Sequence, residues 1–131
     1  MERTFKPAGY SSLSPYLIVE DAGRLIKLME AVFEAKLLRR FDFPNGDPMH
    51  VELKIDDTVL MITTATETWP SAPVMLHVYV PDAQACFQKA LGAGCESLRE
   101  PVVEEGDTDL RGMFKDFAGN TWAISTQQKN S

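Results

Sequence analysis

The two histidines of the chain and one nearby glutamate are the residues best able to do chemistry. His50 and Glu52 stand two residues apart in an alternating stretch, so on a β-strand their side chains project from the same face. His77 falls on the equivalent face of a later stretch, and two imidazoles with one carboxylate suit non-haem iron or zinc. The same residues also fit a polar anchor for an organic ligand. They fit ordinary strand roles as well, with His50 hydrogen-bonded and Glu52 either solvated or paired with Lys54 or with an arginine such as Arg39 or Arg111.

A second group of residues offers apolar and soft contacts. Aromatic rings and thioethers accommodate flat apolar ligands, and the residues of this kind are Met61, Trp69, Met75 and Tyr79. Alternatively, these side chains fill the core or the seam of a dimer. Trp122 alternates with Thr121 and Ala123, so we expect it to pack against the helices.

Several functional classes have no sequence support. The chain lacks the glycine-rich phosphate loops and the Gly-x-Ser-x-Gly nucleophile elbow. Its two cysteines, Cys86 and Cys95, form no CxxC or Cys/His cluster, so we expect them to be reduced and mostly buried.

Net charge and hydropathy limit the kinds of binding partner and the cellular location that we expect for this protein. Nineteen acidic and 13 basic residues give a formal charge of −6, which disfavours nucleic acid and anionic membrane surfaces. No apolar run reaches the roughly 20 residues of a membrane span, and the first residues lack the apolar stretch of a secretion signal. We therefore expect a cytoplasmic protein with no nucleic-acid or membrane partner.

Strand and helix signals follow each other in the same order twice. Hydrophobic patterns and turn residues predict strands at 15–19, 36–43, 49–55 and 58–63 in the first half, and at 74–80, 97–103, 110–116 and 121–125 in the second. A helix capped by Asp21 follows the first strand of one half, and a helix capped by Asp82 follows that of the other. Alternation in the third strand predicts that the side chains of His50 and Glu52 point away from the helices. The side chains predicted to point toward the helices are those of Met49, Val51, Leu53 and Ile55.

The two halves are predicted to be copies of one unit. Val19-Glu20-Asp21-Ala22 recurs as Val80-Pro81-Asp82-Ala83 at an offset of 61, and Gly46-Asp47 recurs as Gly106-Asp107 at an offset of 60. A unit of about 60 residues is marginal alone, whereas two units can close one core. The sequence thus predicts a single α+β domain over residues 1–131, with modules at about 13–64 and 73–127.

This order of elements resembles that of the vicinal oxygen chelate superfamily of glyoxalase I, bleomycin-resistance proteins and extradiol dioxygenases. The motifs that carry the resemblance are the two strand-to-helix joints above, Met49-His50-Val51-Glu52, and the closing run from Asp116 to Trp122 (D-F-A-G-N-T-W). The chain is most similar to a small, poorly characterised glyoxalase-like branch. The resemblance covers about residues 10–127 and implies curled mixed sheets around a cavity, helices outside, and a homodimer.

The resemblance also places the metal ligands of metal-dependent members on this chain. Those members use one residue in the first strand and one in the last strand of each module, and the matching positions here are Ser14, Met61, Met75 and Ala123. None supplies the imidazole, carboxylate or thiolate that a divalent cation needs. We therefore expect no cofactor and no glyoxalase I activity by that mechanism.

The leading hypothesis is a homodimeric small-molecule-binding protein that sequesters its ligand or performs weak, metal-free polar catalysis. Its expected ligand-binding residues are His50, Glu52, Met61, Trp69, His77 and Tyr79, and no residue stands out as catalytic. One alternative is a metal-dependent lyase, isomerase or dioxygenase that uses a relocated site of His50, Glu52 and His77. Another is a structural or interaction domain whose own side chains fill the cavity. The sequence does not identify the ligand.

Overall fold

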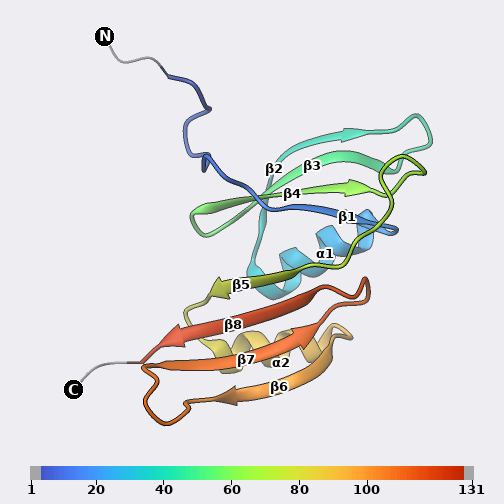
Figure 1. The fold of residues 1–131 in the computed structure, drawn as a ribbon. Coiled ribbons are helices and arrows are strands. Elements are labelled where there is room, and N and C mark those ends of the chain that lie inside the picture. Colours follow the sequence, from blue (N-terminus) through green and yellow to red (C-terminus); the bar gives the residue numbers. More distant parts are fainter. Residues whose placement is uncertain (1–3, 129–131) are drawn as a thin grey trace.

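The computed structural model describes residues 4–128, so the two ends of the predicted 1–131 domain lie outside the described residues (Figure 1). The first module contains β1 (Tyr16–Val19), α1 (Ala22–Phe33), β2 (Lys36–Asp42), β3 (Pro48–Ile55) and β4 (Thr58–Thr64). The second contains β5 (Met75–Tyr79), α2 (Ala83–Gly92), β6 (Glu96–Val102), β7 (Asp109–Lys115) and β8 (Thr121–Gln127). The strand orders, β1-β4-β3-β2 and β5-β8-β7-β6, are the same in both modules. The predicted α+β fold of two βαβββ modules with mixed sheets is confirmed.

Both helices begin at the aspartates that the sequence indicated. The Asp21 side chain accepts a hydrogen bond from the backbone N–H of Arg24 at 3.1 Å, and the Asp82 side chain accepts one from Ala85 at 3.0 Å. Helix α2 ends next to Gly94, whose φ of +98° is the left-handed conformation that favours glycine. At 12 and 10 residues, these helices of the described chain are too short to cross a membrane.

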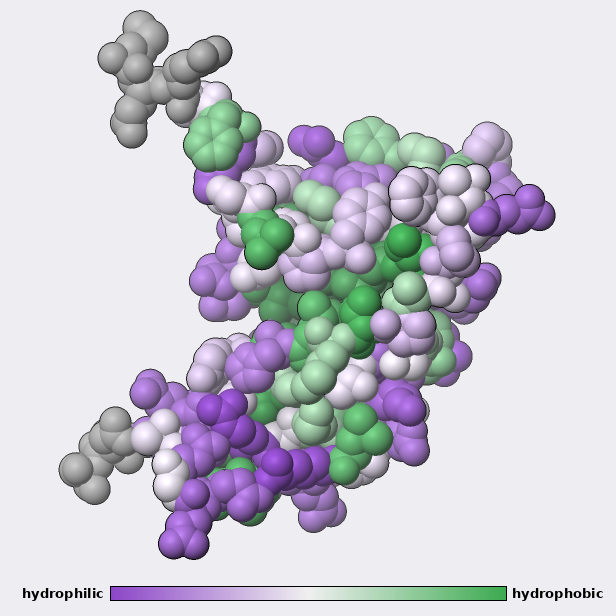
Figure 2. Space-filling view, in the orientation of Figure 1, coloured by the Kyte–Doolittle hydropathy of each residue, from purple (hydrophilic) through white to green (hydrophobic). Residues whose placement is uncertain are grey.

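The helix-facing sides of the two modules share one hydrophobic core. Phe33 of α1 packs on the second sheet, with its ring centroid 5.2 Å from that of Trp122 and 6.2 Å from that of Phe114. Trp122 is only 1% exposed, so its predicted packing against the helices is confirmed. Helix α1 lies between the two sheets and α2 lies behind the lower one (Figure 1). Hydrophobic residues gather in the band where the modules meet (Figure 2).

Both cysteines belong to this core, as the sequence suggested. The Sγ of Cys86 lies 3.7 Å from the carbonyl oxygen of Val32 on the other helix, and neither thiol forms a disulfide. Burial raises the pKa of each thiol to about 11. Because the thiolate is the reactive form, these cysteines are structural residues in the folded chain.

The turn between β7 and β8 is built around a single buried carboxylate. Oδ1 of Asp116 accepts hydrogen bonds from the backbone N–H groups of Ala118 and Asn120, at 2.9 and 3.0 Å. Its Oδ2 accepts from the Asn120 amide at 3.1 Å and from the indole N–H of Trp122 at 2.9 Å. This closing motif therefore ties the β7–β8 turn to the core.

One strand prediction was wrong. Met49 was expected to point toward the helices, but its side chain is 41% exposed and lines a pocket on the opposite face of the sheet. The pairing of β2 with β3 shifts between Phe41 and Asp42, so that Phe41 pairs with His50 while Asp42 pairs with Pro48. Such a bulge inserts one residue and breaks the alternation, and Pro48 is buried beside it.

Candidate functional site

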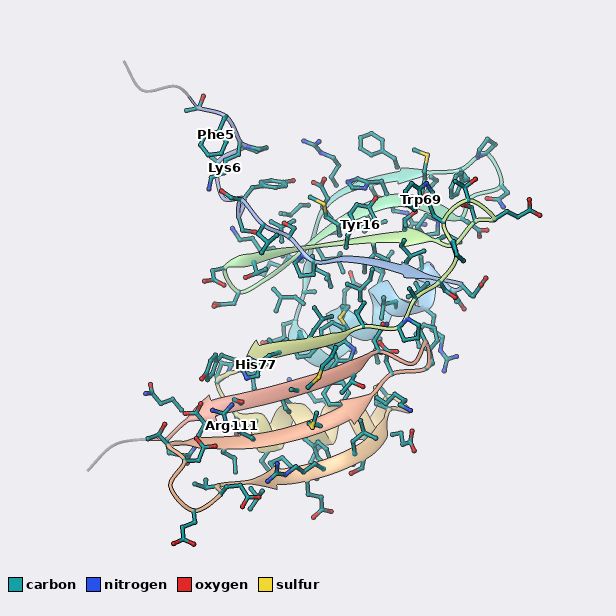
Figure 3. All side chains as sticks on the ribbon, in the orientation of Figure 1. Phe5, Lys6, Tyr16, Trp69, His77 and Arg111 are labelled. Carbon is teal, nitrogen blue, oxygen red and sulfur yellow. The ribbon has the colours of Figure 1, made fainter. Side chains whose placement is uncertain are left out.

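The outer face of the first sheet carries a pocket of about 800 Å³. Its lining includes Tyr16, Ile18, Phe43, Met49, Thr63 and Trp69. Trp69, from the loop after β4, is 65% exposed and Tyr16 is 49% exposed, so aromatic surface faces the open pocket. Figure 3 shows Tyr16 and Trp69 with the upper sheet and His77 and Arg111 with the lower one. The pocket volume lies within the range of small-molecule sites, about 300–1,000 Å³.

A chain of four hydrogen-bonded side chains begins at the pocket wall. The Tyr16 hydroxyl lies 2.9 Å from Nδ1 of His50, and Nε2 of His50 lies 2.7 Å from Oε2 of Glu52. The hydroxyl of Tyr10 donates to the other carboxylate oxygen, Oε1, at 2.5 Å. Arg39, the cross-strand neighbour of Glu52, places its Nε 3.8 Å from that same oxygen. We call Tyr16, His50, Glu52 and Tyr10 the relay.

Glu52 is the buried centre of this relay, with 5% exposure. Burial by itself raises the pKa of this carboxyl, but the hydrogen bonds from Tyr10 and His50 and the charge of Arg39 outweigh it, so the pKa is lowered. The same carboxylate raises the pKa of the Tyr10 phenol through their hydrogen bond. Burial, and then the charge of Glu52, raise the pKa of Tyr16. Glu52 is therefore a charged acceptor at neutral pH, and both phenols stay protonated.

The outer face of the second sheet holds a separate polar cluster. Nε2 of His77 lies 2.8 Å from the hydroxyl of Ser125, and Nη1 of Arg111 donates to the same oxygen at 3.1 Å. The Tyr79 hydroxyl donates to Oδ2 of Asp109 at 2.7 Å, and Nη2 of Arg111 donates to that oxygen at 3.0 Å. Arg111 is thus held by acceptors of its own sheet.

The charges of this cluster set the protonation of its histidine. Burial and the neighbouring Arg111 cation lower the pKa of His77, so its imidazole is neutral at pH 7. The hydrogen bond from Arg111 lowers the pKa of Asp107, which lies 2.6 Å away. A second cavity of about 310 Å³ lies between the modules and includes His77 and Tyr79 in its lining.

The structure separates the site residues that the sequence placed together. His50 and Glu52 are neighbours, and the expected pairing of Glu52 with Arg39 is present, but His77 lies on the other sheet. Within residues 4–128, no three His, Cys, Asp or Glu side chains are grouped closely enough to hold a metal ion. One chain therefore does not assemble the relocated site of His50, Glu52 and His77.

The remaining candidates divide between the two faces. Trp69 lines the large pocket, whereas Tyr79 belongs to the cluster on the second sheet. Met61 is the β4 neighbour of Tyr16 but is not part of the pocket lining. At the family's metal positions, Ser14, Met61, Met75 and Ala123 offer a hydroxyl, two thioethers and a methyl group. That donor set does not fit a divalent cation.

Sequence reasoning missed several residues of the site. Tyr10 precedes the first predicted strand at 15–19, and its bond to Glu52 joins residues 42 positions apart. No local pattern reports such a contact. Arg111 was considered only as a partner for Glu52, although the neighbouring Asp107 and Asp109 were a signal of local pairing.

Known proteins share both the sequence pattern and the fold. Residues 11–124 match the model of the Glyoxalase/Bleomycin resistance protein/Dioxygenase superfamily. An uncharacterized protein of Mycobacterium bovis is 28% identical over 124 residues, covering 86% of this chain and 81% of the relative. Uncharacterized proteins of Mycobacterium tuberculosis are also 28% identical, and the match covers 72% of their length.

Solved structures with the same fold share less sequence. TioX from Micromonospora sp. ML1 has a TM-score of 0.76 at 19% identity, covering 89% of this chain and 98% of its own. TnmS3, an antibiotic binding protein from Streptomyces sp. CB03234, has a TM-score of 0.69 at 17% identity, covering 88% and 93%. Glyoxalase I from Zea mays has a TM-score of 0.72 at 18% identity, covering 90% of this chain and 45% of its own. The chain therefore belongs to the Glyoxalase/Bleomycin resistance protein/Dioxygenase superfamily.

Proposed function

We propose that this protein binds and sequesters a flat, mainly apolar small molecule in the pocket on its first sheet. The observation that carries the proposal is a cavity of about 800 Å³ bordered by Trp69 and Tyr16. A structural domain with a filled cavity would leave no such space. Ligand sites typically combine an apolar wall with few polar groups, and here the relay supplies the polar group at the wall.

The shape of the pocket favours a planar ligand. Indole and phenol rings offer flat surfaces that stack on aromatic molecules, and the thioether of Met49 adapts to their edges. The antibiotic-binding description of TnmS3 adds support for this ligand class. In this proposal the ligand is held without a metal at Ser14, Met61, Met75 and Ala123. Of the expected ligand-binding residues, Trp69 lines this pocket, and His50 and Glu52 act on it through Tyr16.

Replacing Trp69 by alanine is expected to weaken binding of planar antibiotics by about tenfold or more, because it removes the largest stacking surface. A thermal-shift screen with planar antibiotics, glutathione conjugates and small oxoacids finds the ligands, and titration calorimetry measures their affinity. Trp69→Phe is the matched control, since it keeps an aromatic ring. Stabilisation only by oxoacids or glutathione conjugates, or affinities that Trp69→Ala leaves unchanged, would contradict the proposal.

We further propose that the two modules, about residues 13–64 and 73–127, act as one domain that forms a homodimer. The shared core uses the helix-facing side of both sheets, which leaves apolar side chains exposed on the outer faces. The exposed residues are Tyr16, Phe41, Met49 and Trp69 on the first sheet, and Met75, Tyr79 and Val102 on the second. Pairing the first sheet of one copy with the second sheet of another would cover both patches and place His77 and Tyr79 opposite the pocket.

The dimer has a direct test. Light scattering after size exclusion should give twice the chain mass of 14.6 kDa. The Met75→Glu variant should elute as a monomer, because the new carboxylate would be buried without a partner. The control Ala31→Glu adds the same charge on an exposed position of α1 and should stay dimeric. A wild-type mass of one chain would refute the dimer.

A further inference from the structure

The proton positions in the relay follow from the chemistry of its members. A carboxylate is an acceptor only, so Nε2 of His50 must carry the proton of its 2.7 Å bond to Glu52. In the neutral ring protonated at Nε2, Nδ1 is bare and accepts a hydrogen bond from the Tyr16 hydroxyl, whose oxygen lies 2.9 Å away. In this arrangement the Tyr16 hydroxyl donates its only proton to His50. Tyr16 can therefore offer a ligand only the lone pairs of its oxygen, as an acceptor.

The hydroxyl groups of two threonines on the pocket wall can likewise act only as hydrogen-bond acceptors toward a ligand. The Thr63 hydroxyl donates to the carbonyl oxygen of Met49 at 2.5 Å, and the Thr64 hydroxyl donates to that of Pro48 at 2.6 Å. Because carbonyl oxygens cannot donate, both hydroxyl protons are committed to the backbone. Three of the five hydroxyl groups on the pocket wall, those of Tyr16, Thr63 and Thr64, therefore present acceptor oxygens.

The pocket also lacks a positive charge in the described lining. No lysine, arginine or histidine is among its lining residues. The relay that reaches its wall contains the buried Glu52 carboxylate. An anionic ligand would find no cation in this lining and would be repelled by Glu52. In the proposed dimer, the Arg111 of the facing sheet is already held by Asp107, Asp109 and Ser125. A hydrogen-bond donor on the ligand would find several acceptors.

We propose that this pocket selects flat aromatic ligands that carry a hydrogen-bond donor, such as a phenolic hydroxyl or an arylamine, and rejects aromatic carboxylates. This inference rests on the proposed function and specifies that its ligand carries a hydrogen-bond donor and no negative charge. Tyr16 determines the specificity, while His50 and Glu52 act as positioning residues through it.

The tautomer of His50 tests the relay without a ligand. Nitrogen-15 NMR of the histidine rings at neutral pH should show the Nε2-protonated neutral form for His50, assigned by the loss of the other signal in a His77→Gln variant. A His50 ring that carries a proton on Nδ1, either alone or together with Nε2, would overturn the inference, since Tyr16 would then be free to donate.

Three probes test the selectivity: 2-naphthol, its methyl ether 2-methoxynaphthalene, and 2-naphthoate. By calorimetry, 2-naphthol should bind about three- to tenfold more tightly than the ether, the gain of one net hydrogen bond. It should bind at least about tenfold more tightly than the carboxylate. Tyr16→Phe should lower the naphthol-to-ether preference at least about threefold by removing one acceptor oxygen. The control Thr58→Val deletes a hydroxyl at the start of β4, outside the pocket lining, and should leave the preference unchanged.

The outcomes separate this inference from the proposed function. Equal binding of 2-naphthol and its ether, with both weakened by Trp69→Ala, would overturn the inference and leave the binding function standing. A preference that survives Tyr16→Phe in full would overturn the role of Tyr16. Failure of all three probes to bind would overturn both.

Discussion

Replacing Asp116 by alanine is expected to lower the free energy of unfolding by about 3–4 kcal/mol. The side chain is 4% exposed and accepts four hydrogen bonds, two from backbone N–H groups and two from the side chains of Asn120 and Trp122. Alanine would leave these donors unpaired in a place that water reaches poorly, since Asn120 and Trp122 are each only 1% exposed. Equilibrium unfolding in urea measures the loss.

Two controls frame that experiment. Asp116→Asn keeps the shape and one acceptor oxygen, so its loss should be intermediate. Asp57→Ala removes an exposed aspartate from the β3–β4 turn and should change stability by about 0.5 kcal/mol or less. A loss below about 1 kcal/mol in Asp116→Ala would show that the turn does not depend on this carboxylate.

The second large effect concerns Glu52. Glu52→Ala is expected to cost about 2–3 kcal/mol at pH 7, because hydrogen bonds to a buried charged acceptor are strong. The variant removes the partner of Tyr10 and of His50 together, so the N-terminal segment loses one of its links to β3 and keeps the bond from Lys54 to the carbonyl oxygen of Gly9. Chemical unfolding measures the loss, with exposed Glu67→Ala as the control.

The pH dependence of this effect has a defined sign. Burial raises the pKa of Glu52, but the hydrogen bonds from Tyr10 and His50 lower it by more than burial raises it. The folded-state pKa is therefore below the unfolded one. Such a carboxyl stabilises the fold above its unfolded pKa of about 4.3, and that contribution is lost as the pH falls through the folded-state value. The difference between wild type and Glu52→Ala should therefore be largest near pH 7 and shrink below about pH 4.5. A difference that grows on acidification would contradict this assignment.

Local signals in the sequence were enough to predict the fold. The caps at Asp21 and Asp82 act through neighbouring residues, and the structure confirms them. The repeated Val-x-Asp-Ala joint revealed the duplication, because both copies need the same strand-to-helix turn. The family followed from the same motifs.

The site was predicted only in part, because its geometry depends on long-range pairing. His50 and Glu52 could be placed together, since side chains two apart on a strand share a face. Tyr10 reaches Glu52 across 42 positions, and Met49 enters the pocket through a bulge that alternation does not reveal. His77 could be assigned to an outer face but not to a distance from His50, which depends on how the two modules pack.

The two sides of each sheet have different roles, and this difference affects which positions of the sequence can vary. Folding relies on the side that faces the helices, where Phe33, Phe114 and Trp122 meet. Side chains such as Trp69 and Met49 stand on the other side and are partly exposed, so exchanging them removes few interior contacts. Mutations at such positions can therefore alter the proposed binding pocket while the free energy of unfolding stays nearly unchanged.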